Sequence, residues 1–261
     1  MTGIWAIARN TFREAVRNKI LYSLLMFAVI LIMGSLALGE LTLGEGLRLT
    51  RDLGLYGIDM FGVLIAIFLG VNLLYKELQL KTVYTILPKP IHRYQFVLGK
   101  WLGMICTLAL QVLVMGLVLQ LALFMQGSGI ELAVVKALWL LLVNVIVVTS
   151  IALMFSAFSS PLLSGLLALG IFIVGRSIPD LLALGQKAGG RAEMIVSFAG
   201  RLLPNLHLFF PSGAIVGASR VTVHQDFVNA SYLLWTTLYG FGYSAVAVVL
   251  AIAIFRKRDF V

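Results

Sequence analysis

The sequence predicts an all-α polytopic membrane protein with six transmembrane helices. Of its 261 residues, 61% are hydrophobic and only 12% are charged, a composition typical of proteins embedded in lipid. Several runs of about 18 or more residues carry almost no charge, and a helix of that length crosses a hydrocarbon core about 30 Å thick. These observations exclude a soluble fold and predict a single transmembrane domain over residues 1–261.

The six predicted spans are apolar runs separated by charged stretches or by glycine- and proline-containing breaks. They cover residues 20–39, 55–75, 101–126, 132–155, 162–178 and 232–255. The mixed-charge residues 40–54 are expected to form the loop between the first two spans.

Residues 1–19 are predicted to form an interfacial amphipathic helix. Apolar side chains, Trp5 among them, share one arc at 100° per residue, and three arginines share the opposite arc: Arg9, Arg13 and Arg17. Because these basic residues precede the first apolar run, that run is expected to be a retained span and not a removable signal.

Lysine and arginine predict the orientation of the chain in the membrane. With the amino terminus inside, twelve of the 20 basic residues fall in the cytoplasmic stretches 9–19, 76–100 and 256–258, and the short outer loops hold only Arg48, Arg51 and Lys136. Both termini are therefore predicted to be cytoplasmic, in the inner membrane of a prokaryote. The net charge of +9 is interpreted as contact with anionic lipid headgroups and not with nucleic acid.

The basic stretch 76–100, KELQLKTVYTILPKPIHRYQFVLGK, joins the second and third predicted spans on the cytoplasmic side. Residues 77–87 are patterned like a short helix, which Pro88 and Pro90 would end. A loop of this length is expected to be an ordered surface element that docks a partner. The alternative is that its basic residues only set the topology beside lipid.

The segment 179–231 is too apolar for a plain loop. Two short apolar pieces, 194–203 and 206–218, are interrupted by prolines, and pieces of this length more often re-enter the bilayer than cross it. We therefore expect a re-entrant helical hairpin on the outer face, forming an outer gate over a translocation route, because lipid cannot satisfy broken backbone. A static interfacial cap is the alternative. The gate residues are Leu203, Pro204, Asn205, Phe209 and Pro211.

Asp59 is the only acidic residue inside a predicted span, which makes it a candidate functional residue. We expect it to pair with Arg51 or Arg176. The alternative interpretation is a hydrated carboxylate near the start of its helix, where it favours the helix amino end.

The remaining polar and small residues of the spans are interpreted as packing groups. The polar amides are expected to form hydrogen bonds between helices: Gln111, Gln120 and Asn144. The glycine pairs Gly99/Gly103 and Gly213/Gly217 have the spacing that lets helices approach closely, but chance explains such matches in a chain with 25 glycines. Cys106 is also assigned to packing.

The sequence carries no motif for catalysis. A G-x-x-x-x-G-K-[ST] phosphate loop is absent, so ATP hydrolysis is expected in a separate subunit. His92, His207 and His224 lie on different sides of the membrane and have no paired ligand nearby. A Gly-x-Ser-x-Gly nucleophile motif is also absent. We therefore expect no enzyme activity, metal or cofactor in this chain.

The order of elements and several strings resemble the permease subunit of type-2 ABC transporters over nearly the whole chain. After the second span, that family carries a Glu, a Gly-Thr pair, a short apolar helix, a proline, a short polar pair and Leu-Gly-Lys. The matching residues here are Glu77, Thr82, Leu87, Pro90, His92-Arg93 and Leu98-Gly99-Lys100. This chain departs from the pattern with Lys81 in place of the Gly and with the second proline, Pro88. Leu203-Pro204-Asn205 followed by Phe209, and the closing residues 255–260, are also similar to the family.

The resemblance implies a separate ATPase, which would hold ATP and Mg²⁺, and a second permease subunit in a homodimer or heterodimer. It also implies that the helix of residues 77–87 is a coupling helix. Tyr84 and Leu87 would enter a groove on the ATPase, with charged residues at the rim. The residues assigned to docking are Glu77, Lys81, Thr82, Tyr84, Leu87, Pro88, Pro90 and Arg93.

Three functions fit the sequence. The first is the permease of an ABC exporter. The second is a membrane scaffold or assembly component with the same fold. The third is a secondary transporter, which should show inverted repeats and ionisable residues near the midplane. The spans lack a charged lining, so they do not identify a substrate.

Overall fold

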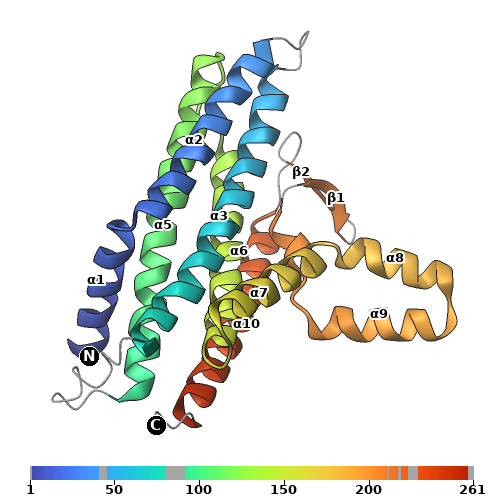
Figure 1. Ribbon diagram of the computed structural model, residues 1–261. Helices are drawn as coiled ribbons and strands as arrows, with labels where there is room; N and C mark the ends of the chain where they lie inside the picture. The colour runs from blue at the N-terminus through green and yellow to red at the C-terminus, as the bar shows by residue number, and fades with distance from the viewer. Residues whose placement is uncertain are drawn as a thin grey trace.

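The computed structural model describes residues 2–40, 46–79, 92–210, 212–216, 219–222 and 229–257. The helices are α1 (Thr2–Val16), α2 (Lys19–Glu40), α3 (Gly46–Gln79), α5 (Arg93–Met125), α6 (Leu132–Ser156), α7 (Pro161–Arg176), α8 (Ile178–Ala188), α9 (Gly190–Leu202) and α10 (Ala230–Lys257), as Figure 1 shows. A short 3₁₀ helix, η1 (Leu206–Phe209), and two strands, β1 (Ser212–Val216) and β2 (Ser219–Thr222), complete the described elements.

Among the described residues, five helices are long and apolar enough to cross a membrane: α2, α3, α5, α6 and α10. The fifth predicted span corresponds to α7, which has 16 residues and is therefore about 24 Å long. This is less than the thickness of a hydrocarbon core. A bend of 65° separates α7 from α8, and the number of spans rises to six if the bent pair counts as one.

Helix α6 lies at the centre of the bundle. It packs against α3, α10, α5 and α7 as well as η1, and 72% of the residues in its most apolar 18-residue stretch are buried. By contrast, only 22% of the residues in the corresponding stretch of α2 are buried. Helix α2 therefore presents most of its apolar surface to whatever surrounds the bundle.

The ends of the helices gather at two poles of the bundle (Figure 1). One pole holds the start of α1, the end of α3, the start of α5 and the end of α10. The other pole holds the end of α2, the start of α3 and the turn between α5 and α6. This alternation agrees with a chain that crosses the membrane repeatedly.

The prediction of a loop over residues 40–54 was wrong, because α3 already begins at Gly46. Polar contacts hold this helical extension against its neighbours. Arg51 Nη2 lies 2.6 Å from Glu131 Oε1, and Thr50 Oγ1 donates to the carbonyl of Ser35 at 3.2 Å. The charges that suggested a loop therefore stabilise two further turns or so of helix.

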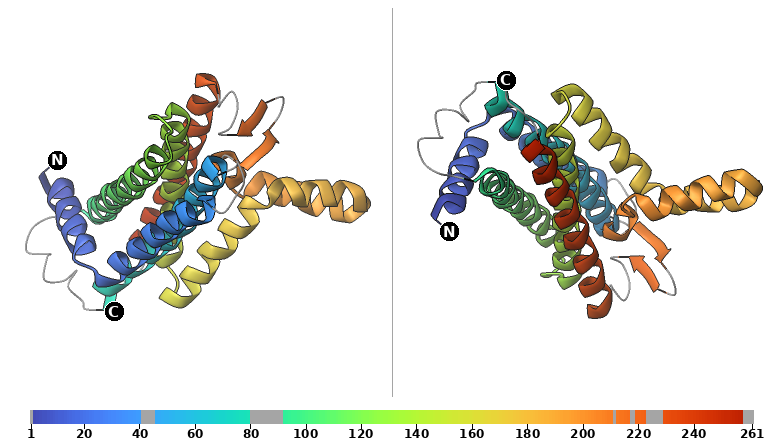
Figure 2. Two further views of the ribbon diagram at one scale, coloured as in Figure 1. Left: turned by 90° about the horizontal axis from the view of Figure 1, so that it is seen from above. Right: turned by 90° about the horizontal axis from the view of Figure 1, so that it is seen from below.

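The segment between α7 and α10 differs in detail from the predicted hairpin of residues 194–218. The helical pair is α8 and α9, which pack against each other and extend away from the bundle on one side (Figure 2). Gly189 and Gly190 have φ of +64° and +60°, values that glycine adopts at little cost, so the chain reverses there.

Beyond α9, the second predicted apolar piece is not an α-helix. It forms η1 and then strand β1, which pairs antiparallel with β2 in the register Ser212↔Thr222 and Val216↔Ser219. The proline at 204 lacks an N–H and restricts the residue before it to extended backbone, and Leu203 indeed has ψ of 148°. Helix α9 therefore ends at Leu202.

Candidate functional site

A buried polar cluster joins α3, α6 and α7. Asp59 is only 2% exposed; its Oδ2 forms an ion pair with Arg176 Nη1, and its Oδ1 accepts a hydrogen bond of 2.8 Å from Asn144 Nδ2. Both carboxylate oxygens therefore have a donor, as a buried charge requires. The expected hydrogen bond of Asn144 between helices is also present.

The position of Asp59 excludes the interpretation of a hydrated carboxylate at a helix start. Because α3 begins at Gly46, Asp59 lies more than three turns into the helix, where the helix dipole no longer acts locally. Of the two arginines proposed as partners, Arg176 makes the pair, whereas Arg51 pairs with Glu131. The sequence alone could not choose between them.

Arg176 is the last residue of α7, and two aromatic rings lie near its guanidinium group. Its guanidinium carbon lies 3.9 Å from the centroid of the Phe210 ring and 6.0 Å from that of Phe172, within the range of cation–π attraction. Burial, followed by the positive charge of Arg176, lowers the pKa of nearby His207 below 6.5. The cluster therefore links α7 to the segment around η1.

Three tyrosines of α10 hold the segment that follows α9. The hydroxyl of Tyr243 donates to the carbonyl of Leu202 at 2.8 Å, and that of Tyr232 donates to the carbonyl of Leu208, also at 2.8 Å. The hydroxyl of Tyr239 accepts a bond of 2.9 Å from the backbone N–H of Asn205. These bonds satisfy backbone groups outside regular helix. No motif in the sequence predicted these three bonds.

The predicted gate residues lie in this tethered segment. Pro204 is buried, and its carbonyl oxygen would be 2.6 Å from a Cβ at Gly175. Phe209 is fully buried, and its ring lies 6.3 Å from that of Tyr239. The described gate residues Leu203, Pro204, Asn205 and Phe209 therefore belong to a packed segment between α7 and α10. We call this segment, residues 202–209, the strap. Pro211 lies outside the described residues.

Helix α1 packs closely against the start of α5 (Figure 2). A Cβ at Gly99 would lie 2.7 Å from Ile7 Cβ, and one at Gly103 would lie 2.6 Å from the Ala8 carbonyl oxygen. No larger residue fits at either position without movement of α1. The interpretation of Gly99/Gly103 as a chance match was therefore wrong. In the other pair, Gly213 belongs to strand β1 and not to a helix, and Gly217 lies outside the described residues.

An ion pair strengthens the contact between α1 and α5. Lys100 is 1% exposed; its Nζ lies 3.6 Å from Glu14 Oε2 and 5.9 Å from the centroid of the Phe96 ring. The sequence suggested that Lys100 either sets topology beside lipid or belongs to the docking loop. In the structure, it connects two helices inside the protein.

Most of the predicted docking loop falls outside the described residues. This applies to Lys81, Thr82, Tyr84, Leu87, Pro88 and Pro90. Glu77 lies in the last turns of α3, and Arg93 is the first residue of α5. The expected helix start at Glu77 was wrong, because Lys76–Gln79 are good helix formers that prolong α3. Just before α5, His92 stacks on Tyr94 with ring centroids 5.6 Å apart.

Within the described ranges, no group of three or more His, Cys, Asp or Glu residues is placed to hold a metal ion. Cys106, which was assigned to packing, is exposed on the surface of α5.

Comparison with known proteins identifies the family. A family model described as "ABC-2 family transporter protein" matches residues 5–260, which is nearly the whole chain, and confirms the resemblance inferred from the sequence. A search of curated proteins returned no match.

Proposed function

Because the chain belongs to the ABC-2 transporter family, we propose that it is the permease subunit of an ABC exporter driven by a separate ATPase subunit. The family is a membrane component of transport systems and is generally not catalytic itself. ATP and Mg²⁺ would be held by the partner, since this sequence has no phosphate loop. The ATPase would dock on the loop between α3 and α5, through Glu77 to Arg93.

The continuity of α3 is the observation that most supports this proposal. Helix α3 runs without interruption from Gly46 to Gln79, beyond the candidate span that ends at Asn72. A helix transmits displacement along its axis because its hydrogen bonds are internal. A push on the docking loop would therefore move Asp59, which lies on the same helix.

From Asp59, the displacement would pass to α7. The ion pair to Arg176 and the packing of α3 against α7 join the two helices directly. Since α7 ends at Arg176 and the chain bends by 65° into α8, a shift of α7 would change the position of the α8–α9 pair. Helix α5, which starts at the other end of the docking loop, would carry α1 with it through Gly99, Gly103 and Lys100.

We divide the proposed outer gate into a moving part and a fixed part. We assign the moving part to α8 and α9, and we assign the strap of residues 202–209 to a fixed support. Three tyrosines and the buried side chains of Leu206 and Phe209 support this division. On α9, the apolar residues Met194, Ile195 and Phe198 are more than two-thirds exposed, so the pair has an apolar surface available for lipid or for a second subunit.

The complete transporter would contain two permease subunits and two ATPases. Both termini and the docking loop would lie in the cytoplasm, in the inner membrane of a prokaryote, as the distribution of lysine and arginine predicts. Basic residues at this pole would contact anionic lipid headgroups.

Docking can be tested with a double variant, Tyr84→Glu with Leu87→Glu. Two carboxylates at the centre of an apolar interface cannot be desolvated cheaply, so co-purification of the ATPase and transport should fall at least about tenfold, while the amount of permease in the membrane stays the same. The matched control is Ile130→Glu, which places a charge on an 81% exposed residue at the opposite pole. Retained ATPase binding by the double variant would refute docking at this loop.

A further inference from the structure

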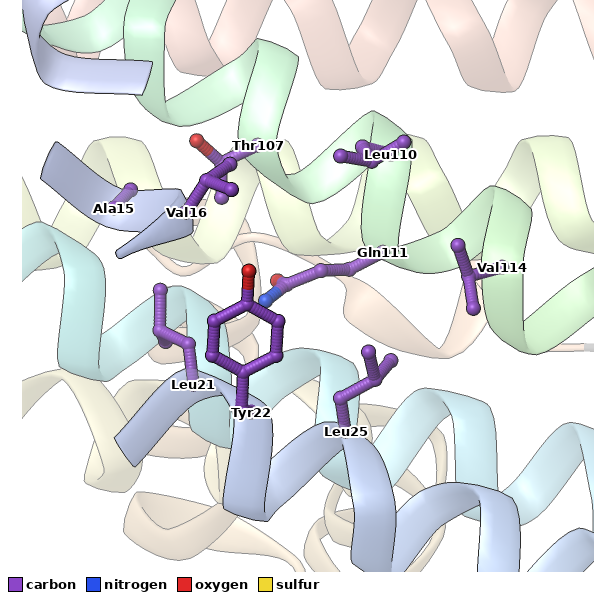
Figure 3. Close-up of a pocket in the computed structure, with 9 residues that line it drawn as sticks. All are labelled: Ala15, Val16, Leu21, Tyr22, Leu25, Thr107, Leu110, Gln111 and Val114. Carbon is purple, nitrogen blue, oxygen red and sulfur yellow. The ribbon is translucent and has the colours of Figure 1, made fainter. Parts of the chain in front are cut away.

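A cavity of about 150 Å³ lies in the elbow between α1 and α2, facing α5. We refer to it as the elbow pocket. Figure 3 shows Ala15 and Val16 at the end of α1, Tyr22 and Leu25 on α2, and Gln111 on α5 around this space. The lining is mostly apolar, and Figure 3 shows three polar side chains at it: the amide of Gln111 and the hydroxyls of Tyr22 and Thr107.

Gln111 is buried with its side-chain oxygen unpaired. It is only 8% exposed, and no donor from the described part of the chain reaches its Oε1. The side-chain oxygens of Asn144 and Gln120 also lack a donor, but these two amides donate through their nitrogens, to Asp59 at 2.8 Å and to the carbonyl of Gly129 at 3.5 Å. The nearby hydroxyl of Thr107 is already used, because it donates to the carbonyl of Gly103 at 2.9 Å. An acceptor left unpaired in an apolar site loses its hydrogen bonds to water without replacing them, so this pocket favours a molecule that brings a donor.

The pocket is accessible from the lipid side. Its deep wall is formed by Ala15 and Leu21, which are at most 2% exposed, whereas Tyr22 and Leu110 at its edge are 54% and 41% exposed. Both edge residues belong to candidate membrane spans, whose exposed apolar surface faces lipid. A molecule that enters here therefore comes from the bilayer.

We propose that the elbow pocket binds a hydroxyl-bearing amphiphile of the bilayer, such as a lipid with a free hydroxyl group. The hydroxyl group donates to Gln111 Oε1, and the adjoining apolar part fills the space between α2 and α5. An apolar cavity of about 150 Å³ is large enough to hold a molecule of the size of benzene. The size and the unpaired acceptor of Gln111 thus favour a short apolar group next to one donor.

The test is photolabelling of the full-length protein in lipid nanodiscs. The probes are an octanol that carries a diazirine and the matching octane with the same diazirine but no hydroxyl group. One hydrogen bond of about 1 kcal/mol corresponds to roughly fivefold in affinity, so the alcohol should label peptides containing Tyr22 and Leu110 about fivefold more than the alkane. Unlabelled octanol should compete with this labelling, and octane should compete less.

Two variants identify the acceptor. Gln111→Leu should reduce the preference for the alcohol to about onefold, while Gln120→Leu, an amide on the same helix that donates to the carbonyl of Gly129, should preserve it. Equal labelling by both probes in the unchanged protein would show an adventitious apolar site and overturn the proposal. A preference that persists in Gln111→Leu would overturn it as well. The competition experiment needs no variant, and none of the readouts depends on an ATPase or on transport.

Discussion

Asp59 of α3 and Arg176 of α7 form an ion pair although 117 positions separate them in the sequence. The carboxylate is buried, while the arginine side chain is 25% exposed and contacts the Phe210 ring. Desolvation of two charges offsets much of their attraction, so such pairs are weak evidence for added stability, but removal of one partner leaves an uncompensated charge. The pair is therefore better understood as a specific link between two helices.

The first prediction is that Asp59 and Arg176 are energetically coupled. Asp59→Asn and Arg176→Gln should each lower the free energy of unfolding by on the order of 3 kcal/mol, because each leaves a charge without its partner. The double variant should lose less than the sum of the two, as expected for residues in contact. Unfolding by denaturant in detergent micelles measures all three.

The control for this cycle is Lys136→Gln. Lys136 lies on α6 and makes no ion pair within the described residues, so its loss should change the free energy of unfolding by less than about 0.5 kcal/mol. Strict additivity of the Asp59 and Arg176 variants would argue against the link.

The second prediction concerns the tyrosines of α10. Tyr232→Phe with Tyr243→Phe removes two hydroxyl donors to the carbonyls of Leu208 and Leu202, and should cost about 0.5–1.5 kcal/mol for each bond. Amide hydrogen exchange of residues 202–208 should accelerate, because this strap then opens more easily. Tyr56→Phe is the control, since it keeps the ring, whose centroid lies 6.4 Å from that of Phe210 in a T-shaped arrangement. Unchanged exchange in the double variant would mean that packing alone holds the strap.

The third prediction is that α1 depends on close contact at Gly103. A methyl group there would lie 2.6 Å from both the Ala8 carbonyl oxygen and Thr11 Cβ, so Gly103→Ala should cost about 1–3 kcal/mol by overpacking and expose α1 to hydrogen exchange. Gly34→Ala on α2, where nothing lies within 4 Å, should be neutral or stabilising because alanine favours helix. If α1 stays equally protected in Gly103→Ala, the contact is not needed.

The fourth prediction tests the orientation. In a variant whose exposed Cys106 is replaced by Ala, single cysteines at Ile130 and Gln186 should react with a membrane-impermeant maleimide added to intact cells. A cysteine at His92 should react only after the cells are opened, because the basic pole is predicted to face the cytoplasm. All three positions are exposed, so access to the reagent depends on the side of the membrane. Labelling of residue 92 from outside would invert the proposed topology.

The long apolar runs predicted most of the helices, because a span in lipid needs an uninterrupted apolar surface and little else. The prediction was wrong where charged residues suggested a loop but tertiary contacts neutralise their charges. Residues 46–54 look like a loop, yet the pairing of Arg51 with Glu131, 80 positions away, keeps them helical. Such pairs have no local signal in one sequence.

The candidate site was only partly predictable for the same reason. Asp59 stands out as the acid in an apolar run, but its partner depends on how α3 meets α7. The hydrogen bonds of the three tyrosines were not predictable. Their partners are backbone atoms of an irregular segment, and every residue type has the same backbone carbonyl, so the partner residues carry no sequence signal. Lys100 resembled the basic residues that set topology. Its burial against Glu14 was not predictable, because it depends on Gly99 and Gly103, which let α1 come close to α5.

The strap of residues 202–209 has a consequence for the order in which the molecule is built. Its hydrogen bonds reach Tyr232, Tyr239 and Tyr243, all on α10, which the ribosome delivers after every other described helix. Until α10 inserts, the carbonyls of Leu202 and Leu208 have no hydroxyl donor from it, and Phe209 lacks its stacking partner. Biogenesis of the region around α7 is therefore completed from the carboxyl-terminal side, and a nascent chain that stops before α10 would carry an unfinished strap for quality-control proteases to recognise.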